Sequence, residues 1–318
     1  MNAFKLVLRR VLIAPILLFV IATFTFFLGI LAQRFHDPVA SLTTETTTAK
    51  QLADLHHQYG LDRPVLSRYG DWLSGAVRGD LGRPLKSNIP VSRIVGQALP
   101  VTVSLAFGGL LVGLLIGLPA GLIAALRPQR LLDRTMSAGA AVGQSVPGFW
   151  LGILFVTWFA LERKWFPATG FRGPTEGIVP WIKSITLPSI ALGLAASATI
   201  CRQTRSAMLG ALQQEYVRTA IAKGLPLRTV VLKHALKNAA APTVTSIAFI
   251  LTALLSGSVV VERVFAMQGL GSVAIDAVVG GEQLVLLGVV VATALIVVAV
   301  GVILDLTYMW LNPKVRIQ

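Results

Sequence analysis

The sequence predicts an all-α, polytopic membrane protein with six transmembrane helices and with both chain ends on the cytoplasmic side. Its mean hydropathy is +0.73 and only 13% of its residues are charged, whereas about a quarter of a soluble domain is charged. Six long apolar runs alternate with polar segments along the 318 residues. The four segments that this topology places inside carry 15 Lys and Arg, and the two short outer loops carry 5. This bias is the expected orientation signal.

The first apolar run, Val11–Ala32, has 22 uncharged residues and follows Lys5, Arg9 and Arg10. A cleaved signal peptide has an apolar core of about 7–15 residues, whereas about 20 residues are needed to cross the hydrocarbon. We therefore expect an uncleaved first helix with its N-terminus inside. Residues 1–32 form the first of three predicted segments of the chain.

The second segment, residues 33–98, is polar, with eight Lys or Arg and six Asp or Glu, and is expected outside the membrane. Asp62 and Pro64 open a predicted helix in it, and residues 79–82 form a turn after that helix. The apolar residues of the predicted helix are Val65, Tyr69, Trp72, Leu73 and Val77. This segment either packs as a small cap on its own helices or also receives a partner protein.

The third segment, residues 99–318, is predicted to hold a core of five spans together with an inner polar segment, residues 202–241. Its first run, Pro100–Leu126, has a glycine at every fourth position: Gly109, Gly113, Gly117 and Gly121. Helices in lipid associate by close packing at small residues. The row of glycines therefore predicts a packing surface for another helix.

The next run, Met136–Leu161, is interrupted near its middle by Val146-Pro147-Gly148. Backbone groups that such a break frees must be satisfied by protein or by water. We therefore expect Pro147 and Gly148 to face protein or a water-lined cavity, and to line a translocation path.

Three further apolar runs complete the six: Ile185–Cys201, Ala239–Val261 and Leu284–Leu304. The run Ile185–Cys201 is short, and the preceding residues 181–182 can extend it. After Val261 we expect an acidic external loop that contains Glu262, Asp276 and Glu282.

The inner segment 202–241 is strongly basic, with seven Lys or Arg and one acid, Glu215. Leu212, Tyr216 and Ala220 are spaced by four residues, so we expect them on one face of a helix. The segment is either a solvated basic loop that follows the orientation rule or a docking element for another protein.

A bend is predicted within this basic segment. Gly224 suits the positive-φ position that ends a helix, and Pro226 suits the first turn of a second helix. Pro242 is expected to end that second helix. Small residues at the bend would let another protein surface approach the backbone closely.

Several kinds of chemistry are not indicated by the sequence. It has no Walker-type lysine loop for ATP, no catalytic constellation, and one cysteine, so no disulfide framework or cysteine metal site is expected. The adjacent His56 and His57 do not share a helix face, so no metal site is expected there. The net charge of +14 follows the orientation bias rather than a nucleic-acid site. Ion-driven carriers need ionisable groups at mid-membrane, and the expected spans hold almost none.

Several strings resemble one family of transporters. Ala220-x-x-x-Gly224, followed by Asn238 and Pro242, resembles the EAA-type loop of ABC importer permeases, and Tyr216–Leu225 (YVRTAIAKGL) is similar to the B-type permease of the dipeptide, oligopeptide and nickel branch. Arg218-Thr219-Ala220 stands where Glu-Ala-Ala is usual, which is common in the peptide branch. Further similar strings are residues 60–64, 69–73, 79–82, 262–271 and the tail 312–316.

The resemblance implies an ABC importer permease fold with a helical external loop, in a bacterial cytoplasmic membrane. It implies a second homologous permease, one or two ATPase subunits that hold ATP and Mg inside, and a substrate-binding protein outside. It also implies that the chain itself has no cofactor and is not an enzyme. The expected function is the uptake of dipeptides or oligopeptides.

The same resemblance implies two docking sites. The expected contacts with an ATPase are Tyr216, Val217, Arg218, Thr219, Ala220, Lys223 and Gly224. The expected contacts with the binding protein are Tyr69, Trp72 and Asp80. The alternatives are a carrier or channel that works without an ATPase, a membrane enzyme or scaffold, and a permease of the same family for nickel or glutathione.

Overall fold

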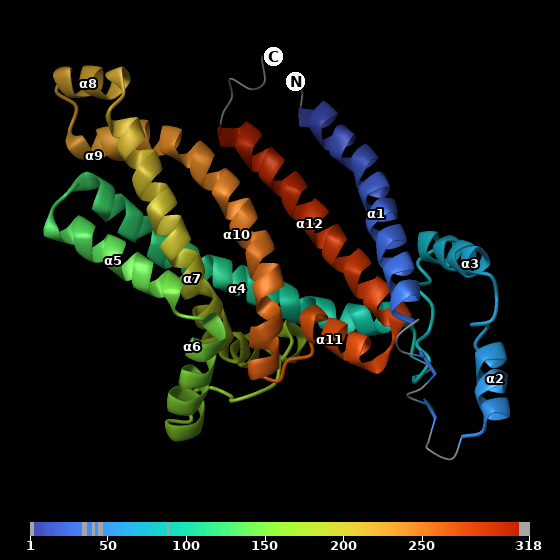
Figure 1. The fold of residues 1–318 in the computed structure, drawn as a ribbon. Helices are drawn as coiled ribbons and strands as arrows, with labels where there is room; N and C mark the ends of the chain where they lie inside the picture. Colours follow the sequence, from blue (N-terminus) through green and yellow to red (C-terminus); the bar gives the residue numbers. More distant parts are fainter. Residues whose placement is uncertain (1–2, 34–36, 40–41, 44–46, 88, 312–318) are drawn as a thin grey trace. The chain divides into compact units, whose positions relative to one another are not determined.

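The computed structural model describes residues 3–33, 37–39, 42–43, 47–87 and 89–311, and its regular structure in these ranges is entirely helical (Figure 1). The C-terminal string 312–316 lies outside the described residues.

Within the described residues, five helices are long and apolar enough to cross a membrane. They are α1 (Ala3–Gln33), α4 (Val91–Leu126), α7 (Ile178–Leu212), α10 (Leu236–Val264) and α12 (Gln283–Leu311). A sixth span is a bent pair, in which α5 (Leu131–Ser145) meets α6 (Gly148–Phe155) and the π-helix η2 (Val156–Glu162) at 89°. Counted this way, the prediction of an all-α chain with six spans is confirmed. The bend lies at the predicted break, residues 146–148.

The chain forms two compact units, each built from segments that are distant in the sequence. Unit 1 comprises Met1–Arg10, Thr102–Met267 and Ala299–Gln318. Unit 2 comprises Val11–Val101 and Gln268–Val298. The three consecutive segments expected from the sequence stay a prediction about topology, and the compact units cut across them.

In unit 1, α7 packs against α5, α6 and α10 (Figure 1). The glycine row of α4 faces α7 at very short range: a Cβ on Gly117 would lie 2.6 Å from the Ser197 carbonyl oxygen. A Cβ on Gly121 would lie 2.5 Å from the Cys201 carbonyl oxygen. Only glycine permits this approach, so the small residues predicted to form a packing surface do meet another helix.

The helix α7 contains the predicted run Ile185–Cys201 and extends beyond it on both sides, since it has 35 residues and carries the first basic residues of the segment 202–241. One expected boundary in unit 1 is wrong. Pro242 does not end a helix, because α10 continues through it to Val264. A proline removes a single helical hydrogen bond, and neighbouring helices can compensate for it in a membrane protein.

The expected acidic loop after Val261 is also revised. Glu262 lies in the last turn of α10, is fully buried, and accepts hydrogen bonds from the Thr102 Oγ1 at 2.7 Å and the Ser258 Oγ at 3.0 Å. The helix α11 (Leu270–Gly280) occupies much of the segment between α10 and α12. The spans are therefore less free of ionisable residues than the sequence suggested.

In unit 2, the polar region is attached to the C-terminal part of the chain. It holds α2 (Ala49–Gln58) and α3 (Val65–Val77). The buried carboxylate of Glu282 accepts hydrogen bonds from the backbone N–H groups of Leu85 and Lys86, both at 2.8 Å. One acidic side chain thus fixes the non-helical segment after α3, although more than 190 residues separate them in sequence.

Candidate functional site

The basic segment folds into a short helix, α8 (Glu215–Ala222), followed by the single turn α9 (Leu227–Thr229). Glu215 lies in the first turn of α8, where a carboxylate is stabilised by the helix dipole. Gly224 has φ +75°, and the Leu225 N–H donates to the Ala220 carbonyl oxygen at 3.3 Å, so the helix ends in a left-handed turn. Pro226 precedes α9, and the helix–Gly–helix bend is as predicted.

One face of α8 is buried on its own chain. Val217 is 2% exposed and Ala220 is 7% exposed, and both pack against Val230 and the partly buried Leu212. The predicted face Leu212, Tyr216 and Ala220 is wrong, because α7 ends at Leu212 and the chain leaves helical geometry before Glu215. A continuous helix through Leu212 would have turned Tyr216 inward. In the structure Val217 is the buried residue instead.

The residues expected to contact an ATPase therefore divide into two groups. Val217 and Ala220 are buried in the molecule. The others are exposed: Tyr216, Arg218, Thr219, Lys223 and Gly224.

Sequence reasoning missed several exposed apolar side chains around the bend. Ile221 is 53% exposed and Leu227 is 63% exposed. Leu225 and Leu232 are exposed as well. Apolar residues in a strongly basic segment were the available signal, but helical spacing alone did not indicate which of them turn outward.

A buried floor lies beneath α8. It begins at Val230 and continues along the π-helix η4 (Val230–Ala235) through Val231 and Ala235. Val231 and Ala235 pack with Met208 of α7 and Ala125 at the end of α4, and η4 runs directly into α10. Short π-helical segments are rare and often occur at functional sites. The floor joins α8 to three long helices of unit 1.

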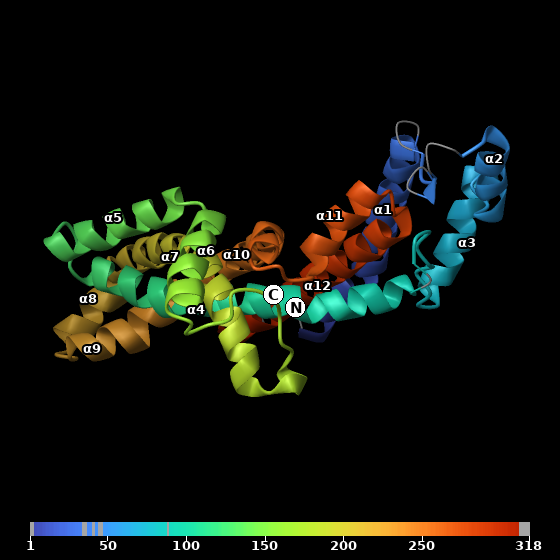
Figure 2. The ribbon, with the colours of Figure 1, turned by 90° about the horizontal axis from the view of Figure 1, so that it is seen from below.

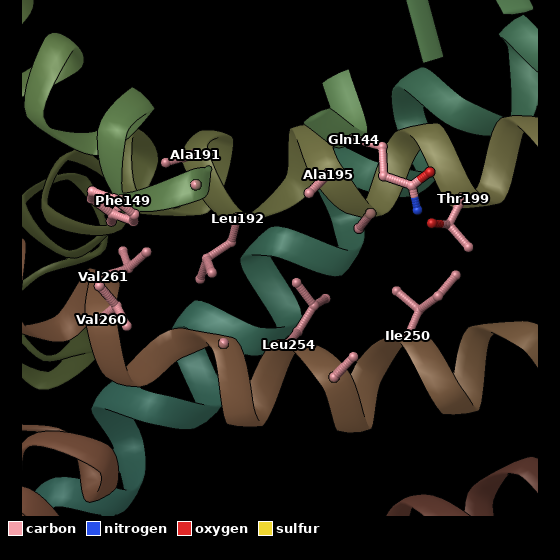
Figure 3. Close-up of a pocket in the computed structure, with 14 residues that line it drawn as sticks. Gln144, Phe149, Ala191, Leu192, Ala195, Thr199, Ile250, Leu254, Val260 and Val261 are labelled. Carbon is pink, nitrogen blue, oxygen red and sulfur yellow. The ribbon is translucent and has the colours of Figure 1, made fainter. Parts of the chain in front are cut away.

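At the C-terminal end of α5, a pocket of about 390 Å³ opens among α5, α6, α7 and α10 (Figure 3). Figure 3 shows Phe149 and Val261 at one end of it and the polar side chains Gln144 and Thr199 at the other. Gly148 borders this pocket, whereas Pro147 is not among its lining residues. The helix α6, which borders this pocket, and α8 lie apart within unit 1 in both ribbon views (Figures 1 and 2).

The residues expected to dock a binding protein are mostly turned inward. Trp72 is 8% exposed and packs in one cluster with Phe26 of α1 and Leu287 of α12. Tyr69 is half-buried beside it, with its ring centroid 5.2 Å from that of Phe26. Asp80 is exposed, and its carboxylate accepts the Gly82 N–H at 2.9 Å in the turn after α3. Two of the three residues thus attach α3 to the spans.

Family comparisons identify the chain. Residues 117–317 match the family of binding-protein-dependent transport system inner membrane components, and residues 3–106 match the N-terminal part of the same type of component. The chain belongs to this permease family. It is therefore a multi-pass inner-membrane subunit of an ABC transporter, not itself catalytic, which works with separate ATPases and a binding protein.

Individual relatives support the same assignment. This permease is 31% identical over 310 residues, 98% of each chain, to a probable peptide ABC transporter permease of Sinorhizobium fredii. It is 31% identical over 283 residues to the oligopeptide transport system permease AppB of Bacillus subtilis, covering 88% of this chain and 90% of the relative. The predicted family is confirmed, and the alternatives of a lone carrier or a membrane enzyme are excluded.

A solved structure supports the fold. The permease resembles a chain of the methionine ABC transporter MetNI in an inward-facing conformation, with a TM-score of 0.56 and 20% identity. The match covers 69% of this chain and 96% of the other. At this identity the likeness concerns the fold alone.

Proposed function

We propose that this permease imports dipeptides or oligopeptides, together with a second, homologous permease, and that α8 receives the motion of the ATPases. Relatives with 31–34% identity over most of the chain are described as peptide or oligopeptide transport permeases, which supports the substrate class. Nickel and glutathione are the alternative solutes.

The exposed apolar side chains around the bend carry the coupling proposal. Tyr216, Ile221 and Leu227 keep 38%, 53% and 63% of their surface exposed on a segment outside the spans. Exposed apolar side chains grouped on a water-facing surface indicate a protein partner. The cations Arg218, Lys223 and Arg228 lie among them and provide a polar rim.

The packing beneath α8 can transmit the motion of the ATPases from α8 to the membrane spans. Val217 and Ala220 are buried against Val230, so α8 cannot shift without moving the floor that joins α7 and α10. Packed interfaces tend to move as rigid bodies rather than deform continuously. ATP-driven closure of the ATPase pair would thereby reach the spans and produce alternating access.

The pocket bordered by Gly148 is the part of this chain that we assign to the translocation path. Its walls are mostly apolar, with Gln144 and Thr199 as polar groups. A second permease facing it would complete the path. On the outer side, we propose that the exposed turn at Asp80, rather than the buried Trp72, contributes to docking of the binding protein.

The proposal is tested with Ile221→Glu in the complete transporter, with both permeases, its ATPases and its binding protein. A charge among the exposed apolar side chains of the bend should abolish ATPase co-purification and uptake of labelled peptide, while membrane insertion is retained. Leu66→Glu is the matched control, because Leu66 is 74% exposed on α3, far from the basic segment in sequence. Normal ATPase binding by the Ile221 variant would refute the coupling site. Uptake of nickel or glutathione but not peptide by the wild type would refute the substrate class.

A further inference from the structure

The first turn of α5 contains a buried carboxylate, paired with a partly exposed arginine of α7, that the proposed function does not use. Asp133 is 4% exposed, and its carboxylate accepts hydrogen bonds from the Arg205 Nε at 2.5 Å and Nη2 at 2.7 Å. The Gln129 N–H donates to it at 2.8 Å and the Ser137 Oγ at 3.3 Å. Four donors from α7, from the α4–α5 turn and from α5 itself therefore converge on one carboxylate.

Burying the Asp133 carboxylate costs free energy unless its hydrogen-bond donors are all present. A buried carboxylate is tolerated only when it is paired and hydrogen-bonded, and the loss of one partner strongly destabilises a protein. The turn also holds Gln129 at φ +63°, a conformation that residues other than glycine rarely adopt. The two-donor contact from a planar guanidinium fixes both distance and orientation, so the pair holds α5 at one register on α7.

Arg205 lies on α7 between the floor beneath α8 and the pocket at the C-terminal end of α5. On its C-terminal side, Met208 and Ala211 of α7 belong to the floor beneath α8. On its N-terminal side, Arg202 donates to the Gln144 Oε1 at 2.5 Å, and Gln144 borders the pocket at the end of α5. Two polar contacts therefore join α5 to α7, one at each end of α5.

We propose that Asp133 and Arg205 are positioning residues that clamp α5 to the segment of α7 supporting α8, so that motion of α8 also moves the break at residues 146–148. The proposal rests on the coupling role proposed for α8. Without the clamp, α7 could shift while α5 stays behind, and ATP hydrolysis would no longer move the wall of the pocket.

The decisive readout is the number of peptides taken up per ATP hydrolysed. A merely structural pair affects assembly, or lowers uptake and hydrolysis together, and leaves this ratio unchanged. A clamp in the coupling route lowers the ratio itself.

The test uses the double variant Asp133→Asn, Arg205→Gln in the complete transporter in proteoliposomes. Removing both charges avoids an unpaired buried ion, so the chain should insert and assemble with its ATPases. We expect ATP hydrolysis to persist and uptake per ATP to fall roughly tenfold, a typical size for a coupling between two sites. Arg134→Gln, which removes an exposed cation from the residue next to Asp133, is the control and should keep the wild-type ratio.

A second variant keeps the proposal testable if the double variant does not assemble. Arg205→Lys retains the charge but loses the two-donor geometry, and it should lower uptake per ATP severalfold. A wild-type ratio in either variant overturns the clamp. If the Ile221→Glu variant keeps its ATPases, the proposed function fails. If that variant loses them while these two variants couple normally, the clamp alone fails.

Discussion

The short helices α8 and α3 both lie outside the membrane spans, and they use their apolar residues in opposite ways. On α3, the largest side chains point inward: Trp72 is 8% exposed and Tyr69 is half-buried. On α8, the inward residues are the smaller Val217 and Ala220. Larger side chains such as Ile221 stay exposed on α8.

On α3 the large aromatic side chains are packed against the rest of the chain, whereas on α8 the larger apolar side chains are exposed. The exposed apolar residues of α3, Leu66 and Val77, are single and eleven positions apart, which is ordinary for a protein surface. Those of α8 and α9 lie close to one another in sequence around a bend. The comparison indicates that the aromatic residues of the external region hold the fold, whereas the apolar residues of the basic segment remain available to a partner.

The largest loss of folding stability is expected for Trp72→Ala. Removing a large buried aromatic side chain costs about 3–5 kcal/mol, because it leaves a cavity in the cluster that joins α3 to α1 and α12. Thermal unfolding of the purified transporter measures this loss, and Leu66→Ala should change the stability by less than about 0.5 kcal/mol. Unchanged stability together with weaker binding of the binding protein would instead make Trp72 a docking residue and break the comparison.

A smaller effect is expected for Val217→Ala. Two methyl groups are lost from the buried face of α8, which should cost about 2 kcal/mol through lost burial and a residual gap against Val230. Hydrogen exchange of the α8 amides should become faster, since the helix is held to its floor by few contacts. Thr219→Ala on the exposed face is the control. Equal exchange in both variants would contradict the assignment of a buried and an exposed face.

The smallest effect is expected for Glu215→Gln. Glu215 accepts a hydrogen bond from the Arg218 Nη1 at 3.0 Å, but both side chains are largely exposed. Exposed pairs one helical turn apart contribute about 0.5 kcal/mol or less. Unfolding measured at low and high salt should therefore differ little between this variant and the wild type. A large, salt-dependent loss would show that charge, rather than the buried apolar face, holds α8 in place.

Much of the fold could be predicted because lipid imposes simple rules. Uncharged runs of sufficient length indicated the spans, and the Val146-Pro147-Gly148 string indicated the broken one. The row at Gly109 to Gly121 predicted close packing, but only the folded chain identified α7 as its partner, with Gly193 of α7 facing back toward Val112. Pro242 misled the prediction, because whether a proline ends a helix depends on neighbours that the local sequence does not describe.

The candidate site was predictable in its backbone and less so in its side chains. Gly224 and Pro226 specify a bend by their own backbone preferences. The orientation of Val217 and Tyr216 depends on where α7 ends, and two non-helical residues were enough to rotate the face. The buried acids Asp133 and Glu262 were also missed as core residues, since their partners Arg205 and Thr102 are 72 and 160 positions away in sequence.

The sequence by itself determined that this is a six-span permease of a binding-protein-dependent importer with a bent basic element between its fourth and fifth spans. The spans and the bend follow from hydropathy, charge bias and local backbone preferences, which act over a few residues, whereas the family follows from the resemblance of short strings such as Tyr216–Leu225. Only the tertiary structure decided which side chains of α8 are buried and which are exposed, that Trp72 and Tyr69 face inward, and that an ion pair joins α5 to α7. Burial and pairing depend on contacts between distant residues, and such contacts exist only after the chain has folded.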